Sequence, residues 1–289
     1  MTTWIDTVLQ GVLVGGLYAL FAMGLSLVFG VMRLVNIAHG DVIILGAFAG
    51  IALALGVDVN PFLFLIAVVP LMAGAGYLLQ RSVLNRTLGK DILPPLLVTF
   101  GLSIIIQNVL LELFAADARS LKAGVLATQS IRLAADLAIG TLPLITFAVA
   151  LACTCALEFL FSRTGLGRAF RATSDDPEGA QLQGIDHRRI YALATAIAFA
   201  LVAVAGVFLA LRTTVTPSDG PGYLLYAFEA VIIGGLGSFW GTFAGAVILG
   251  VAQGIGYRLD PGWGVLVGHF TFLAVLVVRP QGLFPKTRD

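Results

Sequence analysis

The chain alternates between long apolar runs and short polar connections. Nine apolar runs are visible, at 9–31, 40–56, 62–80, 94–114, 141–161, 190–211, 225–236, 241–257 and 264–278. A helix needs about 20 apolar residues to cross a bilayer. Eight of the runs approach that length, and 225–236 is shorter. The pattern predicts an all-α polytopic membrane protein, a bundle of about 8–9 transmembrane helices.

Composition supports this class. The chain is 58% hydrophobic and 11% charged, whereas a soluble domain carries about 25% charged residues. The formal net charge of +1 gives no reason to expect a nucleic-acid partner. Residues 1–10 hold Asp6 and no Lys or Arg, so we expect the first run to be a span and not a signal peptide. We predict a single transmembrane domain over 1–289, and no internal repeat is visible.

Glycine spacing predicts close contacts between the helices. The chain has 34 glycines, and pairs such as Gly11/Gly15 and Gly250/Gly254 recur at a spacing of four. Small residues at this spacing let helix backbones approach in lipid. The pattern indicates a tight bundle and says nothing about substrate.

The distribution of basic residues predicts the orientation. With the N-terminus outside, 12 of the 17 Lys and Arg residues fall on the cytoplasmic side and five fall outside. The opposite orientation would violate the positive-inside rule. We therefore expect a periplasmic N-terminus and a cytoplasmic C-terminus. This topology closes only if 225–236 also crosses, as a short helix buried among its neighbours.

Residues 162–189 form the one long polar stretch, a predicted cytoplasmic loop between two spans. Asp176 and Glu178 favour a helix start, and Pro177 is tolerated in a first turn. Gly184 can end that helix, which we predict at 177–183, and Asp186 can cap the next span. A capped helix suits a docking surface for a soluble partner. The alternative is a solvated loop whose arginines set topology and meet anionic lipid.

Polar side chains inside apolar runs are rare and point to function. The candidates for lining a substrate pathway are Asn36, His39, Thr99, Ser103, Gln107 and Glu229. Thr99, Ser103 and Gln107 share one helix face. We expect Asn36 and His39, together with Asp41, near the cytoplasmic side.

Glu229 is expected near the external side, where it could attract the ammonium group of an amino acid. The alternative is a structural pair with Arg212 or with free backbone groups. A mostly apolar lining is a further possibility.

No catalytic or nucleotide-binding constellation survives inspection. The stretch 84–91 superficially resembles a P-loop, but Leu84 stands in place of the first glycine and Asp91 in place of the magnesium-binding Ser or Thr. We predict a transport subunit that is not itself an enzyme and holds no cofactor or metal. If transport is driven by ATP, the ATP and Mg must be bound by partner ATPase subunits.

Four segments together resemble the branched-chain amino acid permease family, the membrane subunits of ABC importers. The first is the loop, with Arg163-Thr-Gly-Leu-Gly-Arg168, Asp176-Pro177-Glu178 and Gly184-Ile185-Asp186. The others are 16–20 followed by 35–41, 234–238, and 279–284. The resemblance runs from about residue 8 to 285 and is closer to the first of the two permease subunits.

The resemblance implies an importer of the type II architecture in a bacterial inner membrane. Its partners would be a second homologous permease subunit, two cytoplasmic ATPase subunits and a periplasmic substrate-binding protein, with membrane lipid around it. The helix at 177–183 would couple to an ATPase, through Asp176, Pro177, Glu178, Gly179, Ala180, Leu182 and Gly184. The cargo would be branched-chain or other small amino acids. Alternatives are urea or short amides, or, in a different class, an ion-coupled secondary transporter acting alone.

Overall fold

The computed structural model describes residues 2–55, 60–88, 91, 93–134 and 137–284. Within them, six helices are long and apolar enough to cross a membrane. These are α1 (Thr2–Met32), α3 (Phe64–Ser82), α4 (Leu93–Phe114), α5 (Thr141–Arg163), α8 (His187–Arg212) and α10 (Phe239–Leu259). Three shorter apolar helices are α2 (His39–Ala54), α9 (Gly220–Gly234) and α11 (Gly264–Val278). All nine predicted apolar runs therefore form helices, and the all-α polytopic class is confirmed.

The three shorter helices differ from the expected spans. At 15 or 16 residues, each is about 24 Å long or less, against a hydrocarbon core of about 30 Å. The runs 40–56 and 264–278 are thus too short for full crossings by length alone. Helix α9 starts five residues before the predicted 225–236, because Pro221 occupies its first turn.

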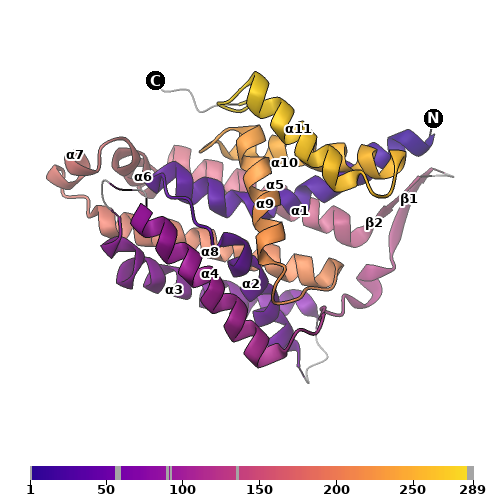
Figure 1. The fold of residues 1–289 in the computed structure, drawn as a ribbon, viewed down its shortest axis with the longest axis horizontal. Coiled ribbons are helices and arrows are strands. Elements are labelled where there is room, and N and C mark those ends of the chain that lie inside the picture. Colours follow the sequence, from indigo (N-terminus) through magenta and orange to yellow (C-terminus); the bar gives the residue numbers. More distant parts are fainter. Residues whose placement is uncertain (1, 56–59, 89–90, 92, 135–136, 285–289) are drawn as a thin grey trace.

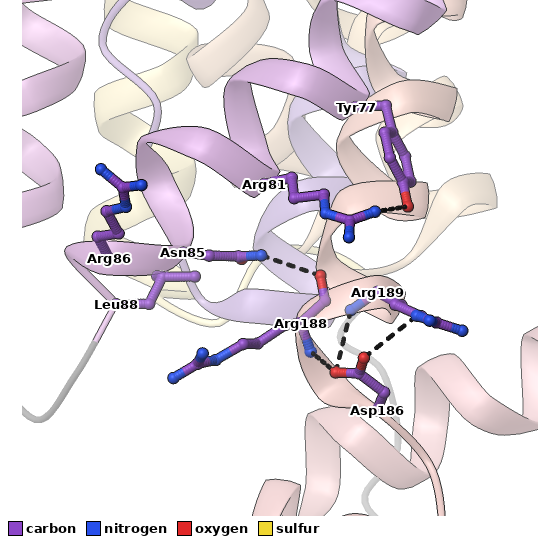
Figure 2. Close-up of a pocket in the computed structure, with 8 residues that line it drawn as sticks. All are labelled: Tyr77, Arg81, Asn85, Arg86, Leu88, Asp186, Arg188 and Arg189. Atoms are coloured by element: carbon purple, nitrogen blue, oxygen red, sulfur yellow. Dashed lines mark hydrogen bonds and ion pairs between the residues drawn. The ribbon is translucent and has the colours of Figure 1, made fainter.

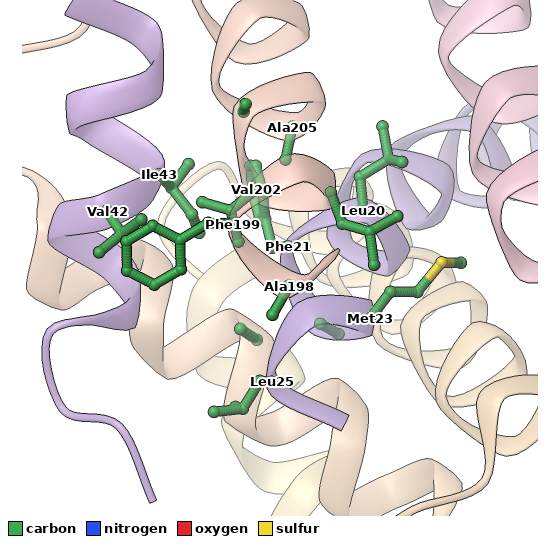
Figure 3. Close-up of a cluster of buried hydrophobic side chains, with 14 of the residues drawn as sticks. Leu20, Phe21, Met23, Leu25, Val42, Ile43, Ala198, Phe199, Val202 and Ala205 are labelled. Atoms are coloured by element: carbon green, nitrogen blue, oxygen red, sulfur yellow. The ribbon is translucent and has the colours of Figure 1, made fainter. Parts of the chain in front are cut away.

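The core lies where α1, α2 and α8 meet. Figure 3 shows Phe21 and Leu20 of α1 beside Val42 and Ile43 of α2, with Val202 of α8 between them. All five side chains are buried. Around this core, α3 packs on α8 and α10 packs on α1 (Figure 1).

The chain repeats one arrangement with inverted direction. Each of α1 and α8 is followed by a segment that turns back and by a short helix, α2 or α9. Helix α2 runs toward the end where α8 finishes, since Gly50 lies against Val207 and Leu121. Helix α9 runs toward the end where α1 finishes, since Gly237, just after α9, lies against Gly30. Inverted repeats of this kind recur in transporters, although no repeat is visible in the sequence.

Glycine contacts hold α1 against α10, as the spacing predicted. A Cβ atom on Gly250 would overlap the carbonyl oxygen of Gly11, and a Cβ on Gly15 would lie 2.8 Å from the carbonyl oxygen of Ala246. The two backbones approach more closely than any larger side chain would allow.

The two ends of the bundle carry different structures (Figure 1). At one end are the start of α1 and a hairpin of β1 (Ser130–Ala134) and β2 (Leu137–Gly140), paired antiparallel from Ser130↔Gly140. The hairpin and η3 (Gly124–Ala127) lie in the connection between the apolar runs 94–114 and 141–161. At the other end lie α6 (Gly165–Asp175), α7 (Pro177–Leu182) and the end of α11.

Short 3-10 turns flank α3. They are η1 (Pro61–Leu63) before it and η2 (Leu84–Arg86) after it. The second turn brings Asn85 against the start of α8, where its side-chain nitrogen donates to the carbonyl oxygen of Arg188 at 3.1 Å.

Candidate functional site

The start of α2 lies deep inside the bundle. After α1 the chain reverses at Arg33, which has a φ of 54°, and the segment 33–38 runs back along α1. A ring nitrogen of His39 lies 2.7 Å from the carbonyl oxygen of Phe21. Phe21 is 11 residues before the end of α1, or about 16 Å along it. The structure thus places Asn36, His39 and Asp41 inside the bundle, because the apolar residues of 33–38 allow that segment to be buried. Their position near the cytoplasmic side stays a prediction.

The start of α9 meets the start of α2. A Cβ atom on Gly40 would overlap the carbonyl oxygen of Gly220, and one on Gly220 would overlap the carboxylate of Asp41. Two helix N-termini, each the positive end of a helix dipole, thus meet in the middle of the bundle. Glycine is required at both positions by this close approach.

A polar hub surrounds this meeting point. We give this name to Asn36, His39, Asp41, Thr99, Ser103 and Gln107. The Gln107 amide donates to Asp41 Oδ1 at 2.9 Å and to Ser103 Oγ at 3.3 Å. The backbone N–H of Ile37 donates to Thr99 Oγ1 at 3.3 Å. The predicted face of Thr99, Ser103 and Gln107 is confirmed, and it packs against the segment that leads into α2.

Asn36 and His39 bond mainly to backbone. Asn36 Oδ1 accepts the N–H of Ala38 at 3.0 Å, and the His39 ring meets the Phe21 carbonyl described above. Both residues are buried, at 3% and 2% exposure. Their contacts are those of groups that shape a turn inside the bundle.

Glu229 lies on the buried face of α9, and its carboxylate pairs with the Nδ1 side of His269 on α11. The predicted alternative paired Glu229 with Arg212. In the structure Glu229 pairs with His269 instead, because α11 packs against α9. The second oxygen, Oε2, is buried without a hydrogen-bond partner among the described residues. Glu229 therefore keeps one free acceptor inside the bundle.

A tyrosine cluster lies one turn from Glu229. We give this name to Tyr18, Tyr223, Tyr226 and Gln253. The Tyr18 hydroxyl donates to Gln253 Oε1 at 2.6 Å, and its ring stacks on Tyr226 with centroids 5.0 Å apart. Tyr226 and Glu229 are three residues apart on α9 and so share a face.

Two further buried nitrogens near this cluster have no hydrogen-bond partner in the described part of the chain. They are Nη1 of Arg212, at the end of α8, and Nε2 of Gln253. Arg212 lies within electrostatic range of the Tyr18 hydroxyl. An unsatisfied buried polar atom in a folded protein calls for an explanation, and a bound ligand is one.

A groove of about 620 Å³ leads to the tyrosine cluster between α1 and α10. Its polar lining residues are Asp6, Thr7, Gln10, Tyr18, Gln253, Tyr257 and Arg258, and glycines form part of its floor. It carries an acidic group, Asp6, and a basic group, Arg258. A small zwitterion would find both charges here, beside aromatic rings.

The predicted helix in the polar loop is present as α7. Asp176 caps it by accepting the N–H groups of Glu178 at 3.1 Å and Gly179 at 3.0 Å. Gly184, with a φ of 83°, follows the helix end, as predicted. Ala180 is buried while Leu182 is 91% exposed, so α7 presents an uncovered apolar side chain.

The following cap is also confirmed. Asp186 Oδ1 accepts the N–H groups of Arg188 at 3.0 Å and Arg189 at 3.4 Å at the start of α8. Upstream, α6 buries Phe170, whose ring stacks on Phe161 with centroids 5.1 Å apart. A hollow of about 640 Å³ beside α7 is lined in part by Asp176, Glu178 and His187.

Sequence reasoning missed Arg212 and Gln253 as candidate contacts. Gln253 is a lone amide in an apolar run, which is the same signal that selected Gln107. Arg212 was considered as a partner for Glu229 and not as a contact in its own right. Among the described residues, no group of three or more His, Cys, Asp or Glu side chains is placed to hold a metal ion.

Several relatives resemble this chain over nearly its whole length. The high-affinity branched-chain amino acid transport system permease protein BraD of Pseudomonas aeruginosa is 31% identical, covering 98% of this chain and 96% of BraD. The corresponding permease protein LivH of Escherichia coli is 29% identical, with the same two coverages. The fructose import permease protein FrcC of Rhizobium meliloti is also 29% identical, covering 92% of this chain and 80% of FrcC.

A chain of the solved structure "PsaBC from Streptococcus pneumoniae in complex with Fab" aligns with 96% of both chains, at 18% identity and a TM-score of 0.49. The family model described as "Branched-chain amino acid transport system / permease component" matches residues 7–276. The chain thus belongs to the family of branched-chain amino acid transport system permease components, which are multi-pass membrane subunits of ABC importers.

Proposed function

We propose that this permease moves branched-chain or other small amino acids into the cytoplasm. The observation that carries the proposal is the near full-length match to permeases named for branched-chain amino acid transport. FrcC matches at similar identity, so identity alone does not choose between cargoes, and the geometry of the site has to contribute.

The proposed substrate contact is the tyrosine cluster with Arg212 and Glu229. The carboxylate of an amino acid would accept from Arg212 Nη1 and Gln253 Nε2, which have no partner among the described residues. The ammonium group would donate to Glu229 Oε2 and lie against tyrosine rings, which attract cations. Urea and short amides carry no charges to match this pair, so the cluster favours a zwitterion over the amide alternative.

The proposed partners are those of a type II importer: a second homologous permease subunit, two cytoplasmic ATPases and a periplasmic binding protein. The proposed location is a bacterial inner membrane, with α6 and α7 in the cytoplasm and the β1–β2 hairpin outside. The basic residues support that orientation, since α6, α7 and the flanking helix ends carry five arginines between 163 and 189.

Helix α7 is the proposed coupling element. It is capped at both ends, and Leu182 is exposed to a partner. Asp176, Pro177, Glu178, Gly179, Ala180 and Gly184 would fix its shape and its contact with an ATPase. ATP can drive transport only if the ATPase distinguishes two states of the permease, and a rigid docked helix is a means of transmitting that difference.

A substrate experiment tests the cargo. The complex would be purified with its operon partners, and ATP hydrolysis measured with leucine, isoleucine, valine, other amino acids, urea and short amides. We expect stimulation by small amino acids delivered by the binding protein. Stimulation by urea or amides alone would overturn the cargo assignment.

A coupling experiment uses Glu178→Ala with Leu182→Ala. We expect a folded, inserted subunit whose complex loses its ATPase or hydrolyses ATP without import. The matched control is Glu112→Ala with Leu113→Ala, the same residue types, exposed at the far end of α4. Normal substrate-stimulated import in the α7 variant would overturn the role of this helix.

One observation favours a second candidate, an ion-coupled carrier. A buried carboxylate bonded to a histidine inside a membrane, as in Glu229 and His269, suits proton coupling. Uptake that survives inactivation of the ATPases and collapses with the proton gradient would identify that mechanism.

A further inference from the structure

A hollow of about 570 Å³ lies where the end of α3 and the turn η2 meet the start of α8 (Figure 2). Its lining consists of four arginines, Arg81, Arg86, Arg188 and Arg189, together with Tyr77, Asn85, Leu88 and Asp186. Four guanidinium groups face one carboxylate, which leaves an excess of three positive charges. We call it the basic hollow, and it is distinct from the tyrosine cluster and from the groove between α1 and α10.

Two of the four guanidinium groups are already engaged. Arg189 Nε lies 3.3 Å from Asp186 Oδ2, and Arg81 donates to the Tyr77 hydroxyl at 3.4 Å. Arg86 and Arg188 make no side-chain hydrogen bond or ion pair with any described residue, and Figure 2 shows both side chains extended. The hollow therefore has unneutralised charge to offer to an anion.

The walls of the hollow are fixed by hydrogen bonds that leave these guanidiniums free. Asn85 bonds to the backbone carbonyl of Arg188, and the amide of Gln80 donates to Asn85 Oδ1 at 3.0 Å. Asp186 caps the backbone N–H of Arg188. The backbone holds Arg188 in place, so its charge is not needed for that structure.

An apolar strip runs from the basic hollow along α3. Leu71 and Leu78 are 63% and 65% exposed, and Arg81 follows Leu78 on the same face. Gly74, between the two leucines, has open space where a side chain would stand. Tyr77 lies at the polar end of this strip, the level at which tyrosine meets lipid headgroups in membrane proteins.

We propose that the basic hollow binds the phosphate-bearing headgroup of an anionic phospholipid, with its acyl chains along the Leu71–Leu78 strip. Basic pockets between transmembrane helices bind such headgroups. A soluble anion would use the charges and leave the apolar strip uncovered. An acidic protein surface docked on these charges would likewise leave the Leu71–Leu78 strip uncovered.

The hollow also adjoins the proposed coupling element. Asn85, Leu88 and Arg188 line both the basic hollow and the hollow beside α7. A lipid bound on one side of this shared wall would stabilise the surface that faces α7 on the other. The proposal concerns lipid binding by this chain and does not depend on the cargo.

The test uses two double variants. The first carries Arg86→Gln and Arg188→Gln, and the matched control carries Arg163→Gln and Arg168→Gln. The control arginines are exposed at the same end of the bundle and lie outside the hollow. The full chain, extracted with its associated subunits, would be analysed by native mass spectrometry after incubation with phosphatidylglycerol or phosphatidylcholine. We expect the first pair to lose on the order of tenfold or more in phosphatidylglycerol retention, and the control pair to match the unsubstituted protein.

Each alternative has its own outcome. Equal loss in both pairs would mean a general charge effect and would overturn the site. Displacement of the lipid by inorganic phosphate as readily as by phosphatidylglycerol vesicles would assign the hollow to a soluble anion. Loss of the ATPase from the first pair with unchanged lipid retention would assign it to a protein. Monodispersity on gel filtration and an unchanged thermal midpoint distinguish lost binding from lost folding.

Discussion

The polar hub and the tyrosine cluster both put polar side chains inside an apolar bundle, and they differ in how those side chains are satisfied. In the hub, side chains bond to one another or to backbone, as Gln107 does to Asp41 at 2.9 Å, and no hub atom is among the fully buried polar atoms that lack a partner in the described part of the chain. Around the cluster, Arg212 Nη1, Glu229 Oε2 and Gln253 Nε2 have none. The hub includes the start of α2 and the cluster includes the first half of α9, the two short helices of the inverted arrangement.

The comparison separates two reasons for a polar group in a membrane. Buried polar groups that have hydrogen-bond partners stabilise a fold. Removing one partner leaves the other buried without a hydrogen bond, at the full cost of its desolvation. Unsatisfied buried groups cost free energy in the resting state, which a ligand would repay on binding. We therefore expect hub substitutions to lower stability and cluster substitutions to lower transport.

The largest effect is expected from Gly40→Ala. Its Cβ would overlap the backbone of Gly220, and backbone contacts between two helix starts cannot relax locally. We expect loss of folded, inserted protein, measured by gel filtration of a fluorescent fusion. Gly222→Ala is the matched control, since Gly222 has nothing within 4 Å of a built Cβ. Normal yields of both variants would break the claim that α2 and α9 meet at this point.

The next effect tests whether Gln107 belongs to the hub or to a pathway. Gln107→Ala leaves the buried Asp41 carboxylate without its amide donor, at a cost of about 2–3 kcal/mol. We expect a lower thermal midpoint in detergent and unchanged uptake per folded molecule. A normal midpoint with a raised half-saturation concentration would instead support the predicted pathway role of Thr99, Ser103 and Gln107.

The sequence predicted the elements better than their depth. Long apolar runs determine helices through the solvent they face, and each of the nine runs is helical in the part of the chain that the structure describes. The cap residues Asp176, Gly184 and Asp186 act locally, and their structures are confirmed too. The burial of the segment before α2 was not predicted, because Leu34, Val35 and Ile37 are compatible both with a loop at the surface and with a buried segment.

The pattern of apolar and polar positions could not predict which side chains far apart in the sequence would pair. Glu229 and His269 are 40 residues apart, and only the packing of α11 on α9 brings them together. The tyrosine cluster joins Tyr18 to Gln253 across 235 residues. Lone polar residues in apolar runs were a real signal, yet the sequence could not tell which of them would find a partner.

Glu229→Gln tests whether the carboxylate beside the tyrosine cluster serves transport or structure. The amide keeps the size of the carboxylate and can still bond to His269, while the negative charge is lost. We expect assembly to remain and the half-saturation concentration for amino acid uptake to rise about tenfold, as for the loss of one charged contact. Glu112→Gln, which removes the same charge at an exposed position, should change neither. Failure of the Glu229 variant to assemble would make this residue structural, like the hub.

The smallest effect is expected from Tyr18→Phe, which removes one hydroxyl and keeps the ring. The stacking on Tyr226 at 5.0 Å remains, while the 2.6 Å bond to Gln253 is lost. Gln253 would then be free to rotate, so its amide would no longer be held ready for a substrate carboxylate. A neutral hydrogen bond contributes about 1 kcal/mol, so we expect about a fivefold rise in the half-saturation concentration. Thr154→Val, which removes a hydroxyl bonded to the Ala150 carbonyl on α5 outside the cluster, is the control. If Tyr18→Phe lowers the thermal midpoint and leaves uptake unchanged, its hydroxyl serves the fold, and the cluster resembles the hub after all.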